Sequence, residues 1–164
     1  MNGIESSNTV GWVLMQKGLS PFALDADLFQ IVWEGENYIV HTDRLPQVFV
    51  EKKIPLELFE YKHENWIVSF AMDRVNMQRS MVTVFRGDSL DTVTFRYCLR
   101  PESEESFSKS LEDCFLRIGQ AVDAFGQACE AAIREDEKDT MSDLMKDLAD
   151  PSPDSPWIQR KVRS

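Results

Sequence analysis

The stretch ENWIVSFAMDRVNMQRSMVTVFRGDSLDTVTFRYCL, residues 64–99, decides the fold because the spacing of its apolar residues changes along it. The first half places Ile67, Phe70, Ala71 and Val75 at helical spacing. In the second half, every second position is apolar, as in strands: Val82, Val84, Val93, Phe95, Tyr97 and Leu99. The alternating residues form two strands, and turn-forming residues lie between Val84 and Val93: Gly87, Asp88 and Asp91. We therefore predict a helix that leads directly into a β-hairpin.

Upstream of this unit, the sequence predicts one short helix and three strands. Ser6 or Ser7 can cap a helix that ends near Gly18. Its apolar residues are Val10, Val13 and Leu14. Strand-like runs follow at residues 28–33, 37–42 and 47–53, and Glu34-Gly35-Glu36 offers a tight turn between the first two.

Downstream, a long amphipathic helix is predicted from an N-cap at Ser103 to about Arg134. Its apolar stripe is Phe107, Leu111, Cys114, Phe115, Ile118, Val122, Phe125, Cys129, Ala132 and Ile133. Gly119 and Gly126 lie on one edge of the stripe, although a glycine inside a helix costs about 1 kcal/mol relative to alanine. Either something packs closely there, the sheet or another subunit, or the glycines are simply tolerated.

We divide the sequence into a domain at residues 1–135 and an acidic, proline-containing extension at residues 136–164. Residues 141–148 form a short amphipathic segment with Thr140 and Asp143 as a capping box. The proline-rich run at residues 150–156 cannot be helical. Trp157 follows it, so the tail is either a docking peptide or an untethered end.

Composition excludes several classes of function. Asp and Glu number 28 against 18 Lys and Arg, and the net charge of −10 repels phosphate backbones and anionic membranes, so we expect neither nucleic acid nor a membrane as partner. No apolar run approaches the roughly 20 residues that span a bilayer. Three cysteines without metal-type spacing suit a reducing compartment, and we expect a cytoplasmic protein.

The sequence offers no catalytic constellation. His41 and His63 have no Cys or His at ligand spacing, and no glycine-rich phosphate loop is present. We therefore predict no catalytic residue, no cofactor, no metal site and no enzymatic activity.

The element order supplies a resemblance. A helix that ends in Val75-Asn76, followed at once by an aliphatic strand, a turn and a second aliphatic strand, resembles the YbjN family of bacterial proteins. That family is similar in fold to the class I type III secretion chaperones. The predicted fold is an α+β domain with a five-stranded antiparallel sheet in the order α-β-β-β-α-β-β-α. The resemblance implies a homodimer and a protein-binding surface, with no catalytic motif.

Aromatic residues on the strands suggest where binding takes place. Phe49 and Phe85 lie on strand faces opposite their aliphatic neighbours, so both faces of the sheet carry apolar side chains. One face needs the long helix as cover, and the other needs a partner, or else the N-terminal helix and the 141–148 segment of the same chain. The candidate protein-binding residues are Phe49, Phe85, Gly119, Gly126 and Trp157.

These features favour a non-enzymatic protein-binding, chaperone-like or regulatory module that forms a homodimer and binds another protein or an extended polypeptide. The alternative is a small-ligand-binding regulatory domain or an enzyme, which requires a pocket with converging polar groups. Asn76, at the end of its helix, is expected to hydrogen-bond nearby loop backbone.

Overall fold

The computed structural model describes residues 3–59, 64–78, 81–87, 89 and 91–149. Its helices and strands follow one another in a mixed order. They are α1 (Ser7–Gln16), β1 (Phe22–Asp25), β2 (Leu28–Trp33), β3 (Glu36–Arg44), β4 (Gln47–Pro55), the 3-10 turn η1 (Leu56–Leu58), α2 (Asn65–Met77), β5 (Val82–Arg86), β6 (Thr92–Leu99) and α3 (Glu104–Ala149). The predicted helix and hairpin of residues 64–99 are thus present as α2, β5 and β6.

The strands form one antiparallel sheet in the order β1-β2-β3-β4-β6-β5. The α+β class is as expected, but the expected five strands are wrong, because the sheet has six. The additional strand, β1, is four residues long, all of them exposed, and it pairs with β2 at the sheet edge. Its sequence FALD has no alternation of apolar and polar residues, so periodicity gave no sign of it.

Local sequence explains the first helix and the β2–β3 hairpin. The Ser6 hydroxyl accepts a hydrogen bond from the Thr9 amide and caps α1. Gly18 ends this helix in a left-handed conformation with φ 77°. Glu34 and Gly35 also have positive φ, 49° and 77°, which is the geometry that a two-residue hairpin turn requires. These three expectations from the sequence are confirmed.

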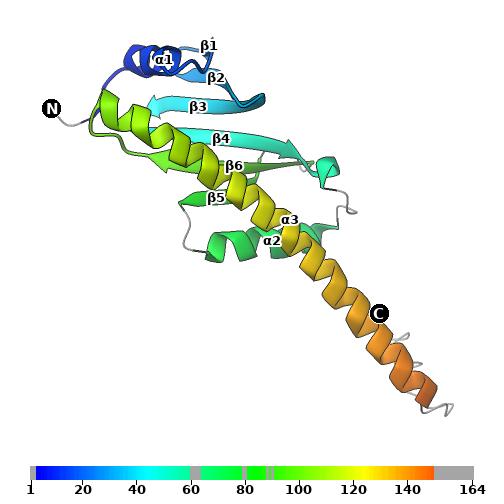
Figure 1. Cartoon of the computed structure of the whole chain (residues 1–164). Helices are drawn as coiled ribbons and strands as arrows, with labels where there is room; N and C mark the ends of the chain where they lie inside the picture. Colours follow the sequence, from blue (N-terminus) through cyan, green and yellow to red (C-terminus); the bar gives the residue numbers. More distant parts are fainter. Residues whose placement is uncertain (1–2, 60–63, 79–80, 88, 90, 150–164) are drawn as a thin grey trace.

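α3 crosses one face of the sheet and buries its apolar stripe there (Figure 1). Phe125 is central to this core, since its ring lies 4.9 Å from that of Phe59 and 5.8 Å from that of Phe95. α1 packs on the same side, because a Cβ at Gly11 would lie only 3.1 Å from the Phe29 ring and because α1 also contacts α3. α2 contributes Val68 and Ala71 to the core, whereas Phe70, which we expected on its buried face, is 38% exposed.

α3 is longer than expected. The Ser103 hydroxyl caps it by accepting a hydrogen bond from the Ser106 amide, as predicted. It then continues without interruption to Ala149, rather than ending near Arg134 with a separate short helix at 141–148. No proline interrupts residues 104–149, and the charged run at 135–139 consists mostly of residues that propagate a helix. The last turns of α3 project beyond the sheet (Figure 1).

Asn76 closes one edge of the sheet. β5 is an edge strand, and the Asn76 side chain occupies the position of a further strand beside it. The side-chain amide donates to the Val84 carbonyl at 2.8 Å, and the Val84 amide donates back to Asn76 Oδ1 at 2.8 Å. Asn76 therefore bonds strand backbone, not the loop backbone that we expected. Because an exposed strand edge invites pairing with other chains, this contact protects β5.

Replacing Asn76 with Asp tests this contact. The carboxylate still accepts from the Val84 amide but cannot donate to the Val84 carbonyl, which it repels. We expect Asn76→Asp to lower the free energy of unfolding by about 1 to 3 kcal/mol in urea titrations. Exposed Asn37→Asp, elsewhere on the sheet, is the matched control and should change it by less than about 0.5 kcal/mol. Equal midpoints for the two variants would contradict the role of Asn76.

Candidate functional site on the open face of the sheet

The face of the sheet opposite α3 is the candidate functional site. Strand register places Phe49 beside Cys98, Glu51 beside Arg96, and Arg96 beside Thr83. Side chains alternate along a strand, so these residues point away from the core residues Val50 and Val84. Within the described parts of the chain, all three helices lie on the other side of the sheet. We call this surface the open face.

A buried carboxylate organises the centre of the open face. The Glu51 side chain is only 3% exposed, and Arg96 donates to its Oε1 from Nε at 2.6 Å and from a terminal guanidinium nitrogen. The other oxygen, Oε2, lies 2.9 Å from Nε2 of His41. The three residues come from three adjacent strands, β3, β4 and β6.

Two aromatic rings flank the guanidinium of Arg96. Its central carbon lies 5.1 Å from the ring centre of Phe49 and 4.8 Å from that of Phe85, so both rings make cation–π contacts with it. Around this stack is a depression of about 300 Å³, lined by Phe49, Met81, Thr83, Phe85, Arg96 and Cys98. Met81 is 58% exposed at its rim. The open face therefore combines apolar surface with a cation that is already held in place.

Electrostatics keep Glu51 ionised. Burial alone raises the pKa of its carboxyl group, but hydrogen bonds from His41 and Arg96, together with their charges, outweigh burial and lower the pKa below its usual value. The carboxylate thus remains charged at neutral pH and fixes the orientation of Arg96. We interpret the cluster of Glu51, Arg96 and His41 as a structural support for the open face.

Other reactive groups lie in the core. Cys114 and Cys129 are buried thiols whose pKa values burial raises, that of Cys129 to about 11, so both stay protonated and unreactive. Cys98 is half-buried beside Phe49, and all three cysteines are free. In the described residues, no cluster of three or more His, Cys, Asp or Glu side chains could hold a metal ion.

The structure brings together only two of the five candidate residues. Phe49 and Phe85 line the same depression, but Gly119 and Gly126 lie on α3, on the opposite side of the sheet. Nothing lies within 4 Å of where a Gly119 Cβ would be, and a Gly126 Cβ would meet Phe59 at an ordinary 3.8 Å. Close packing within the described chain therefore does not require either glycine. Trp157 lies outside the described residues.

Sequence reasoning missed Glu51 and Arg96. They are 45 residues apart and meet only because β4 pairs with β6, although α2 and β5 lie between these strands in the sequence. The sequence did offer one signal, the alternation of side chains along a strand. It places Glu51 on the same face of β4 as Phe49, and Arg96 on the face of the sheet that also carries Phe85.

Comparisons with known proteins bear on the fold. No protein-family model matches this chain, and no curated protein matches it. A solved structure does: that of YbjN from E. coli, a proposed transcription regulator, superposes with a TM-score of 0.53 over 82% of this chain and 97% of the other. The chain has a YbjN-like fold. At 12% sequence identity, the YbjN likeness concerns the fold alone.

The YbjN-like fold agrees with the resemblance drawn from residues 64–99. As for membranes, none of the helices in the described residues is both long and apolar enough to cross a bilayer.

Proposed function

We propose that this chain is a non-enzymatic protein-binding module, regulatory or chaperone-like, that acts through the open face of its sheet. The observation that carries this proposal is the Phe49–Arg96–Phe85 stack, an aromatic surface that no described helix covers and that a buried carboxylate holds in place. The YbjN-like fold supports a regulatory or binding role. The chaperone-like role rests on the resemblance to class I type III secretion chaperones that the element order of the sequence implies. The three free cysteines support a cytoplasmic location.

The occupant that we propose for the open face is a second copy of the chain. The protein carries a net charge of −10, which opposes self-association, but the centre of the open face is not acidic. Glu51 is neutralised by Arg96, and Lys53 lies on the same strand face as Glu51. Two open faces can therefore meet about a two-fold axis without bringing unpaired carboxylates together.

The chain does not cover the open face with its own described helices. α1 packs against Phe29 and α3 on the other side of the sheet. Residues 141–148 belong to the projecting part of α3, where Met141, Met145 and Leu148 are each more than 60% exposed. These placements favour the dimer over the competing expectation, that α1 and the 141–148 segment cover this face within a monomer.

Light scattering tests the dimer and its location. We expect wild-type protein at roughly tens of micromolar to have twice the chain mass of 18.9 kDa. Phe85→Asp should shift it to monomer with an unchanged circular dichroism spectrum, because it removes an aromatic ring from the proposed interface and places one added negative charge on each of the two faces that must meet. The matched control is Leu116→Asp, which alters an exposed apolar residue on α3, and it should remain a dimer.

A single 18.9 kDa species for the wild type would contradict the homodimer. A dimer unchanged by Phe85→Asp would place the interface away from the open face. Gly126→Leu should also leave the dimer intact, because Gly126 lies on α3.

A further inference from the structure

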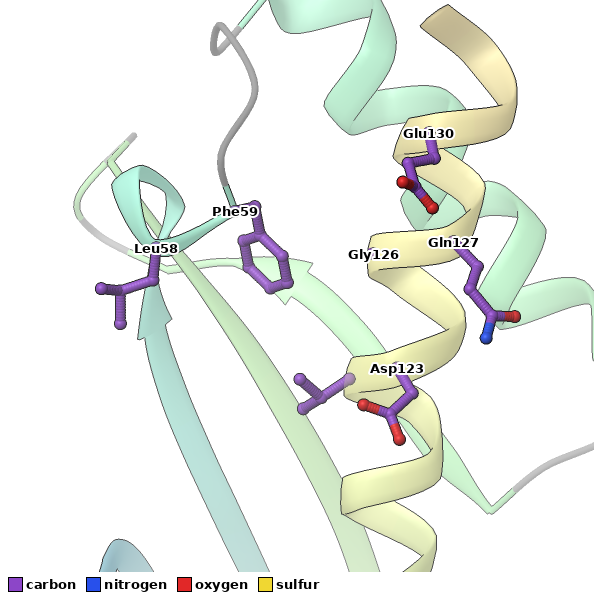
Figure 2. A pocket seen from close by; sticks show the side chains of 7 residues that line it. Leu58, Phe59, Asp123, Gly126, Gln127 and Glu130 are labelled. Carbon is purple, nitrogen blue, oxygen red and sulfur yellow. The ribbon is translucent and has the colours of Figure 1, made fainter. Parts of the chain in front are cut away.

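A second surface lies on the α3 side of the molecule, between the η1 turn and α3. It is a groove of about 400 Å³, open along its length and lined by Leu58, Phe59, Val122, Asp123, Gly126, Gln127 and Glu130. Figure 2 shows Phe59 reaching from the turn toward Gly126 on α3. We call this surface the α3 groove. It is separate from the open face, since the sheet lies between them.

The α3 groove has an apolar floor that is fixed and accessible. Phe59 is held by its 4.9 Å contact with the buried ring of Phe125, whereas Leu58 at the rim is 69% exposed. Gly126 contributes no side chain, which leaves room beside the Phe59 ring for an incoming apolar group. An apolar side chain from a partner would therefore be enclosed by Phe59, Leu58 and Val122.

The charge of the α3 groove has one sign. Asp123 and Glu130 are its ionisable groups, and none of the seven lining residues is basic. Asp123 has no ion-pair partner among the described residues, and Glu130 has only an exposed contact with Arg134 at 3.5 Å. The two acids are seven residues apart, hence separated by about 10 Å along the helix, with Gly126 between them.

We propose that the α3 groove binds a basic amphipathic helix of a partner protein. A helix laid along α3 places residues seven positions apart at the same separation of about 10 Å. Two Lys or Arg residues at that spacing would reach Asp123 and Glu130, and an apolar residue between them would enter beside Phe59. A second copy of this acidic chain suits the α3 groove poorly, which separates this proposal from the dimer of the open face.

A designed peptide provides the probe. We would titrate full-length protein into a fluorescein-labelled alanine-rich helix that carries two lysines seven residues apart and leucines between them on the same face. Binding measured by fluorescence anisotropy should have a dissociation constant on the order of 10 to 100 µM, and it should weaken with salt. A peptide with glutamates in place of the lysines should not bind.

Variants locate the site. Asp123→Asn/Glu130→Gln should weaken binding of the lysine peptide about tenfold. Glu112→Gln/Glu137→Gln removes the same charge from other exposed positions of α3 and should change affinity less than about twofold. Gly126→Leu should block the groove while it improves helix propensity, so lost binding with an undiminished melting temperature supports the proposal.

Several outcomes would overturn the proposal. One is no binding of the lysine peptide to wild type, and another is equal affinity for Asp123→Asn/Glu130→Gln and wild type. Binding that appears only when the chain ends at Ala149 would assign the α3 groove to the chain's own residues. Loss of peptide binding in Phe85→Asp would show that the peptide binds to the open face and not to the α3 groove. Because the dimer is measured separately by light scattering, failure of one proposal leaves the other testable.

Discussion

Phe125→Ala is expected to lower the free energy of unfolding by about 3 to 5 kcal/mol, the range for truncating a buried phenylalanine. Phe125 is fully buried where α3 crosses the sheet, and its ring contacts those of Phe59 and Phe95. Alanine would leave a cavity lined by two aromatic rings, and the η1 turn would lose the contact that holds Phe59. Urea unfolding followed by circular dichroism measures the change.

The matched control for Phe125→Ala is Phe22→Ala. Phe22 is 66% exposed on β1, so the same truncation removes little buried surface and should change stability by less than about 0.5 kcal/mol. An unfolding midpoint for Phe125→Ala that matches wild type would remove Phe125 from the core and would contradict the packing of α3 on the sheet.

Arg96→Met is expected to lower the free energy of unfolding by about 3 kcal/mol at pH 7. The substitution leaves the Glu51 carboxylate, which is 3% exposed, with His41 as its remaining side-chain partner. The loss falls at the low end for a broken buried pair because Arg96 is itself 40% exposed. The double variant Glu51→Gln/Arg96→Met should be more stable than Arg96→Met alone, because it removes the uncompensated charge.

The effect of Arg96→Met should depend on pH in a defined direction. In the wild type, the lowered pKa of Glu51 means that its stabilising contribution is complete above its ordinary value of 4.5 and is lost as pH falls through the lower, folded-state pKa. Without Arg96, burial raises the pKa, so the buried group takes up a proton more readily. The difference in unfolding free energy between wild type and Arg96→Met should therefore begin to narrow above pH 4.5, as the variant's carboxyl group takes up its proton, and should narrow further below pH 4.5, as the wild type loses its contribution. A gap that stays constant between pH 7 and pH 3 would contradict this account of Glu51.

Local patterns in the sequence were sufficient for most elements but not for their arrangement. Helical spacing and strand alternation predicted α2, the hairpin and the start of α3, because each depends on residues close in sequence. β1 has no pattern of its own and exists through pairing with β2. The end of α3 was misplaced because a charged run reads as a helix terminus although its residues continue a helix readily.

The candidate site depended on tertiary pairing. Phe49 and Phe85 were predicted as surface aromatics from their parity, but the residue between them, Arg96, was not. Arg96 lies between Phe49 and Phe85 because β6 lies between β4 and β5 in the sheet. Packing across the whole sheet determines this strand order. The α3 groove was missed for the same reason, since Phe59 meets Gly126 only after α3 crosses the sheet.

The projecting end of α3 has a consequence for how this protein moves through solution. A helix of 46 residues is about 69 Å long, whereas a compact domain of roughly 130 residues has a radius of gyration of about 14 Å. The projecting end of α3, which we call the arm, adds frictional drag with little mass. A monomer should therefore have an enlarged Stokes radius and should leave a gel-filtration column early. Its elution volume would then imitate that of a larger globular protein, whereas scattered intensity follows mass regardless of shape. A chain ending at Arg134 should recover much of the compact behaviour and show how much of the drag belongs to the arm.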